Sequence, residues 1–354
     1  MGKERNSTYE FLRIIAILMI VLIHANIQLS VFATGEIPAN YAGVINGICN
    51  TGVSLFILIS GYFGVSFNVK KLTKLECKMI TYSVIVLILS MVIYGSTMST
   101  GDKLELVVKS FLPFSSRNHW FYSCYVIIVL FSGFIEKFIG TLNKKSFLAF
   151  IAIMMLCFSV LPTFLYFEIV PDNGKGLIQM FMVYMVGRYI RLYGDDFGRQ
   201  HRRLIIGCFV GAWVINFISF EFPIQAGGIY HTLCKDNSIT NMILAVSLFY
   251  IFKDVKMQSR FINKMASYVF AIFAMNYFLI NVLVDWIKAY LPQLTELGAI
   301  GFVMIPVIAV IIMIVCVLVG IIRDLLLSGL DELISVKIEA LFKRMHGFLD
   351  KTTD

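Results

Sequence analysis

Long apolar runs recur along the chain and are separated by short polar connections. A helix needs about 20 mostly apolar residues to cross a bilayer, and ten stretches approach that length. These stretches are 11–33, 42–65, 79–98, 119–140, 147–167, 177–193, 204–220, 239–252, 266–289 and 299–322. The runs are continuous rather than alternating, which argues against a porin-like barrel. The pattern predicts an all-α, polytopic helical membrane protein with about ten transmembrane helices, of which 239–252 is the weakest.

The basic residues alternate with these runs. If the N-terminus is cytoplasmic, 24 of the 30 Lys and Arg residues fall in inner connections and 6 in outer ones. Lys and Arg are enriched on the cytoplasmic side of membrane proteins, so this split predicts that both termini are cytoplasmic. The net charge of +8 is then explained by attraction to anionic lipid, and no nucleic-acid partner is expected.

Composition supports the same class of protein. Of the 354 residues, 58% are hydrophobic and 15% are charged, whereas soluble domains are about 45–50% apolar and about 25% charged. This composition excludes a disordered chain and argues against an ordinary cytosolic enzyme.

Residues 1–327 are predicted to form one transmembrane domain. In residues 328–354 the apolar positions recur at intervals of three and four, which predicts a cytoplasmic amphipathic tail on the inner leaflet.

Several chemistries lack their motifs. The chain has no Gly-x-x-x-x-Gly-Lys-Ser/Thr phosphate loop and no Gly-x-Ser-x-Gly nucleophile elbow. The seven Cys residues include no Cys-x-x-Cys pair, the spacing of zinc and thiol-redox sites. We therefore expect no bound metal and no permanently bound cofactor.

The first span carries the sharpest polar pattern. His24 follows ten consecutive apolar residues, and an ionisable group inside a span is costly enough to suggest a function. Arg13 lies eleven residues earlier, about three turns or about 16 Å, so the two share one helix face, and Glu10 lies within about 40° of it. A guanidinium at the cytoplasmic edge suits a phosphate-bearing ligand, and an imidazole near mid-membrane suits general-base chemistry. The alternatives are a packing histidine and a snorkelling arginine.

A second cluster begins the fourth span. Arg117, His119 and Trp120 stand together in the sequence, at the expected external mouth of that span. Guanidinium and aromatic groups there suit a carbohydrate acceptor, whereas the alternative is an interfacial aromatic belt.

These residues resemble those of the integral-membrane acyltransferase family 3, whose members mostly O-acetylate cell-surface carbohydrates. The segment 10–13 followed by ten residues and His24 resembles the family's Arg/Lys-x10-His signature. The segment 52–63, with its Ser-Gly-Tyr-Phe end, is similar to the family's second helix, and the basic stretch 70–78 and the segment 119–122 are similar as well. One departure is Asn276, at a position where many members carry a histidine. The resemblance covers nearly the whole chain.

The resemblance implies an acyl-CoA-dependent O-acetyltransferase of the stand-alone form, in a bacterial plasma membrane. Acetyl-CoA would be the cytoplasmic co-substrate, and a hydroxyl of a surface or lipid-linked glycan would be the acceptor. His24 would then be catalytic, Trp120, His119 and Arg117 would meet the acceptor, and four residues would bind the donor: Arg13, Glu10, Lys70 and Lys71. The main alternative is a transporter or flippase of a lipid-linked glycan or small solute, since transporters also place ionisable groups at mid-membrane.

Overall fold

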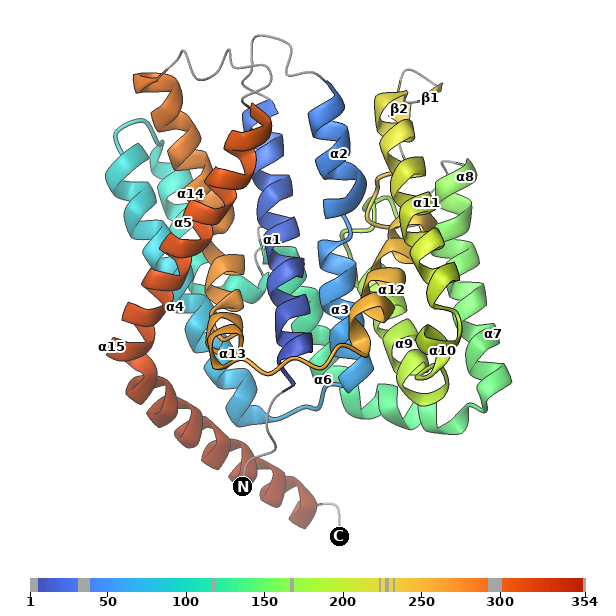
Figure 1. The fold of residues 1–354 in the computed structure, drawn as a ribbon. Coiled ribbons are helices and arrows are strands. Elements are labelled where there is room, and N and C mark those ends of the chain that lie inside the picture. The colour runs from blue at the N-terminus through green and yellow to red at the C-terminus, as the bar shows by residue number, and fades with distance from the viewer. Residues whose placement is uncertain are drawn as a thin grey trace. The chain divides into compact units, whose positions relative to one another are not determined.

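The computed structural model describes residues 6–30, 39–115, 119–165, 169–222, 224–226, 229–231, 233–291 and 301–352. The chain divides into two compact units, which are described separately here. The first contains residues 1–65 and 137–316, and the second contains residues 66–136 and 317–354. The described residues are overwhelmingly helical, as Figure 1 shows, which confirms the predicted all-α membrane fold.

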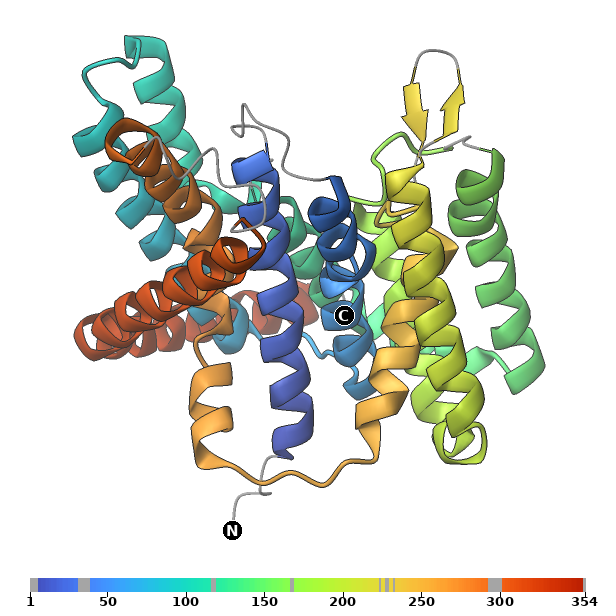
Figure 2. The ribbon, with the colours of Figure 1, turned by 45° about the horizontal axis from the view of Figure 1, so that its top comes forward.

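The first unit is a bundle around α1 (Ser7–Ser30) and α3 (Gly52–Phe63). Its other helices are α2 (Ala39–Cys49), α7 (Lys144–Met155), the π-helix η3 (Leu156–Val160), α8 (Leu161–Leu165), α9 (Leu177–Tyr193), α10 (Phe197–Gln200), α11 (Arg202–Glu221), α12 (Ile239–Lys253), α13 (Arg260–Ala266) and α14 (Val269–Tyr290). The helix α1 packs against α2, α3, α13 and α14, while α3 packs along α9. The strands β1 (Ile224–Ala226) and β2 (Ile229–His231) form a short antiparallel hairpin, drawn as two arrows in Figure 2.

Glycine sets the closeness of the α3–α9 contact. A Cβ atom on Gly61 would lie 2.2 Å from the Tyr184 carbonyl oxygen, and one on Gly187 would lie 2.4 Å from the Leu58 carbonyl oxygen. Small residues allow such backbone approach between membrane helices. The helix α3 then ends at Gly64, whose φ of 73° lies in the left-handed region that glycine adopts readily.

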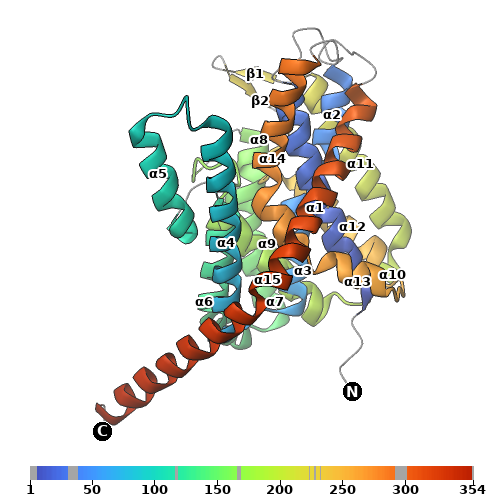
Figure 3. The same cartoon turned by 90° about the vertical axis from the view of Figure 1, so that its left-hand side faces the viewer.

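The second unit contains α4 (Val69–Tyr94), α5 (Thr100–Phe111), the 3₁₀ turn η1 (Pro113–Ser115), α6 (Trp120–Thr141, of which residues up to 136 belong to this unit) and the later part of α15 (Gly301–Thr352). The side chain of Asn68 accepts from the backbone N–H of Lys71 and caps α4, and a Ser99–Asp102 capping box starts α5. The helix α5 turns back alongside the upper part of α4, as Figure 3 shows.

Eight helical segments of the described chain are long and apolar enough to cross a membrane. They coincide with eight of the ten predicted spans. The other two predicted spans are the helices α9 and α12, which have 17 and 15 residues and are therefore shorter. The last predicted span and the predicted tail form one continuous 52-residue helix, α15. The cytoplasmic location of both termini stays a prediction.

Candidate active site

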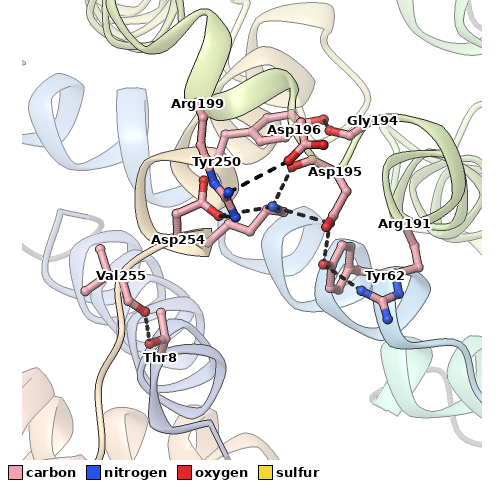
Figure 4. A network of polar contacts seen from close by, with 11 residues as sticks. Thr8, Tyr62, Arg191, Gly194, Asp195, Asp196, Arg199, Tyr250, Asp254 and Val255 are labelled. Atoms are coloured by element: carbon pink, nitrogen blue, oxygen red, sulfur yellow. Dashed lines mark hydrogen bonds and ion pairs between the residues drawn. The ribbon is translucent and has the colours of Figure 1, made fainter.

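The helix α1 carries the three polar residues singled out in the first span, and its start is fixed by the connection after α12. The Thr8 hydroxyl donates to the Val255 carbonyl at 2.5 Å, a contact drawn in Figure 4, and the Ser259 backbone N–H donates to the Ser7 hydroxyl at 2.8 Å. Ser7 and Thr8 are both fully buried. These bonds hold the first turn of α1 against residues about 250 positions away in the chain, so the depth of the residues that follow is set by packing.

Arg13 and Glu10 form an ion pair one turn into α1. Arg13 Nη1 lies 2.7 Å from Glu10 Oε1, and the two side chains are 28% and 13% exposed. A guanidinium has five N–H donors, and this pair uses one of them. The structure thus brings together two of the four predicted donor-binding residues on one helix face.

His24 lies about 16 Å farther along the same helix than Arg13 and only about 9 Å from Ser30. It therefore lies at about three quarters of the length of α1 rather than near its middle, because α1 begins at Ser7, earlier than the predicted span. Its Nδ1 is 2.6 Å from the Oδ1 atom of Asn276, a residue of α14 that is only 1% exposed. The Asn276 amide group in turn donates to the carbonyls of Ile272 and Phe273 at 2.8 and 3.0 Å. The residue that departs from the family pattern is therefore the direct partner of His24.

Two further residues lie beside His24. The Tyr277 ring stands edge-on to the imidazole, with centroids 5.3 Å apart. The Gln28 amide donates to the Tyr277 hydroxyl at 3.2 Å, and Tyr277 is 53% exposed. Gln28 lies one turn after His24 on α1, whereas Tyr277 lies on α14, far away in the sequence.

The lysines predicted to bind the donor belong to the second unit. Lys70 and Lys74 both form ion pairs with Glu332 of α15, and Lys78 pairs with Asp324 at 3.1 Å. Lys71 is an exposed residue in the first turn of α4. A cluster of basic residues on one face of α4 is thus matched by carboxylates on α15.

The residues predicted to contact the acceptor lie at a different position along the bundle from the one that the sequence indicated. His119 Nε2 lies 3.5 Å from the Ser83 hydroxyl, and Tyr122 donates to the Glu76 carboxylate. Ser83 is eleven residues, about 16 Å, from Tyr94 at the C-terminal end of α4. His119 and Trp120 therefore lie beside the middle of α4 rather than at its C-terminal end, because α5 carries the chain back by about 18 Å. Arg117 is outside the described residues.

A polar network at the ends of α3, α9 and α12 was not predicted. Figure 4 shows the Tyr62 hydroxyl donating to Asp195 at 2.6 Å and accepting from Arg191 at 3.1 Å. The Lys253 side chain is 3% exposed and lies 3.3 Å from Asp195 and 3.2 Å from Asp254. Burial opposes ionisation of Asp195, but the bonds from Tyr62 and Lys253 hold its pKa below the usual range. The network joins three helices and includes the tyrosine of the Ser-Gly-Tyr segment.

Among the residues that the structure describes, no three His, Cys, Asp or Glu side chains gather into a metal-binding group.

Residues 6–322 match a family model described as an acyltransferase domain. No curated protein and no solved structure matches the chain.

Proposed function

The chain belongs to acyltransferase family 3 and is a membrane acyltransferase, and from this premise we propose that it O-acetylates a glycan. The donor is cytoplasmic acetyl-CoA, and the acceptor is a hydroxyl of a cell-surface or lipid-linked polysaccharide at a bacterial plasma membrane. The observation that supports this best is the His24–Asn276 hydrogen bond of 2.6 Å, which holds an imidazole in a defined orientation inside a span.

His24 acts as the general base. It takes the proton of the acceptor hydroxyl while that oxygen forms a bond to the thioester carbonyl carbon. The carbon–sulfur bond then breaks, and the imidazolium returns the proton to the leaving thiolate, which gives the acetyl ester and free CoA. A base positioned in this way contributes about 10²–10⁴-fold to the rate.

Arg13 binds a phosphate group of the donor at the cytoplasmic part of α1. Its pairing with Glu10 restricts the guanidinium to one rotamer and leaves N–H donors for a bidentate contact with phosphate oxygens. Lys70 and Lys71 supply further positive charge, and Lys70 must exchange its contact with Glu332 for the ligand. His119, Trp120 and Arg117 form the acceptor contact.

The test is the acetyl content of surface polysaccharide, measured by proton NMR on cells with wild-type protein, His24→Ala or no protein. Acetyl signals with wild type alone support the proposal. Wild-type acetylation in His24→Ala refutes the role of His24. A change in the amount of polysaccharide without a change in acetylation would instead favour a transporter or flippase.

The donor site has a separate test with purified protein. Arg13→Ala should raise the KM for acetyl-CoA in a CoA-release assay and leave kcat within a few-fold of wild type. Arg199→Ala serves as the matched control, because the Arg199 side chain is 66% exposed and, among the described residues, pairs with Asp196 and Asp254 in the network of Figure 4. An unchanged KM in Arg13→Ala would remove its assignment to the donor.

A further inference from the structure

The orientation of the Asn276 amide identifies which His24 nitrogen carries a proton. Both amide hydrogens of Asn276 are used, since its Nδ2 donates to the Ile272 and Phe273 carbonyls. If the amide were reversed, its oxygen would face these two carbonyl oxygens, which are also acceptors, and both hydrogen bonds would be lost. The Oδ1 atom therefore faces His24, and because an amide oxygen only accepts, the Nδ1 atom 2.6 Å away must be the donor.

We propose that Asn276 is a positioning residue that holds neutral His24 as the Nδ1–H tautomer and so makes Nε2 the atom that abstracts the acceptor proton. This inference rests on the proposed function, in which His24 is the base. A neutral imidazole has one N–H and one lone pair, so fixing a proton on Nδ1 leaves the lone pair on Nε2. The described residues provide no hydrogen-bond partner for Nε2, which is the condition for a base that must meet a substrate hydroxyl.

Tyr277 adds a second constraint on the same ring. Its plane is inclined at 80° to the imidazole, with the centroids 5.3 Å apart. Gln28 holds the Tyr277 hydroxyl at 3.2 Å, so the tyrosine is tied back to α1 on the outer side of His24. The imidazole is thus held by Asn276 along one edge and flanked by Tyr277, and rotation about its Cβ–Cγ bond would break the first contact and disturb the second.

An amide suits this position better than a carboxylate would in a membrane span. It accepts the Nδ1–H bond without placing a formal negative charge in a low-dielectric region. After proton transfer to Nε2, the imidazolium still donates from Nδ1 to the amide oxygen. The proton on Nε2 is then the one that passes to the CoA thiolate, and Nδ1 keeps its proton throughout the cycle.

The experiment combines kinetics with nitrogen NMR of protein in lipid bilayers, labelled with 15N-histidine. The chain has five His residues, and the His24 signals are identified by their loss in His24→Ala. Wild type should show Nδ1 protonated and Nε2 unprotonated at neutral pH. Asn276→Ala should shift His24 toward the Nε2–H tautomer and lower kcat by about 10–10²-fold, part of what a general base supplies, with the KM for acetyl-CoA unchanged. Asn276→Asp keeps an acceptor oxygen and should restore the Nδ1–H tautomer and most of kcat.

Asn281→Ala is the matched control, because Asn281 is an amide of the same helix whose Oδ1 accepts no hydrogen bond from the described part of the chain. It should leave both the tautomer and kcat unchanged. An unaltered tautomer in Asn276→Ala, or a wild-type His24 without a proton on Nδ1, overturns the inference even if His24→Ala is inactive. Full activity in His24→Ala instead removes the proposed base itself, and the two failures are therefore distinguishable. If Asn276→Ala does not fold, the tautomer of the wild type and the behaviour of Asn276→Asp still decide the question.

Discussion

The contact between α3 and α9 allows a quantitative prediction about the Ser-Gly-Tyr segment. In Gly61→Ala the new methyl group would lie 2.2 Å from the Tyr184 carbonyl oxygen, whereas ordinary contacts begin at 3.4 Å. The obstacle is backbone, so no side chain can rotate away. The two helices must separate by about 1.2 Å at this point, the difference between these two distances.

The expected cost follows from two opposing effects. Overpacking a close contact costs about 1–3 kcal/mol, whereas replacing a helical glycine by alanine gains about 0.5–1 kcal/mol. Gly61→Ala should therefore lower the free energy of unfolding by about 1–2 kcal/mol. Gly207→Ala is the control, because a Cβ atom there meets no atom within 4 Å, and it should be neutral or slightly stabilising. The two variants should thus differ by about 1–3 kcal/mol, the overpacking cost, because the gain from replacing glycine is common to both.

The assay is reversible unfolding in mixed micelles with increasing SDS, followed by tryptophan fluorescence. Gly187→Ala should resemble Gly61→Ala, since its Cβ atom would lie 2.4 Å from the Leu58 carbonyl oxygen. The double variant should cost less than the sum of the two, because one separation of the helices relieves both contacts. Equal stabilities of Gly61→Ala and Gly207→Ala would refute the packing argument.

Three further predictions concern charged groups. Lys253→Met removes a buried ammonium group and leaves the carboxylates of Asp195 and Asp254 without this partner. Because the Asp195 side chain is 45% exposed, the free energy of unfolding should fall by only about 2–4 kcal/mol. Thermal or SDS unfolding measures this loss, and no change would contradict the role of the network. Burial raises the pKa of Asp236 from 3.8 to about 7, with Lys175 opposing and Asp172 adding to the shift. The folded protein therefore holds a proton that the unfolded chain lacks between these values, so its stability should fall as the pH rises from about 4 to 7. Asp236→Asn should flatten this part of the stability profile, and an identical profile would exclude Asp236 as its source. Glu332→Gln should free Lys70 and lower the KM for acetyl-CoA in the CoA-release assay, and an unchanged KM would remove Lys70 from the donor site.

The span pattern was predictable because membrane helices must satisfy their backbone internally over about 20 apolar residues. The helices α1, α4, α6, α14 and α15 follow this rule directly. The helices α9 and α12 are shorter and are covered by protein, with Thr240 and Asn241 almost fully buried in α12. Burial against other helices rather than lipid lets such a segment include polar residues, and it is the length of these two helices that sets them apart from the eight longer ones.

The candidate site was predictable only where its geometry is local. Arg13, Glu10 and His24 lie on one helix, so the helical period alone relates them. Asn276 is 252 residues from His24, and no periodicity links positions on separate helices. The same holds for Lys253 with Asp195 and for Lys70 with Glu332, whose partners are set by packing. In the sequence Asn276 is a departure from a family pattern, whereas in the structure it is the residue that touches the histidine.

The helix α5 explains why the depth of the acceptor cluster was not foreseen. It has only 12 residues and includes Asp102, Lys103, Glu105 and Lys109, so it reads as a polar external loop. A period of 3.6 residues separates its exposed positions into an apolar stripe of Leu104, Val108 and Phe111 and a polar stripe of Asp102 and Glu105. The buried Ser110 lies between the two stripes on the remaining face, which packs on α4. A short helix with one exposed apolar and one exposed polar face is suited to the boundary between lipid and water, and by running back along α4 it carries His119 and Trp120 toward the centre of the span.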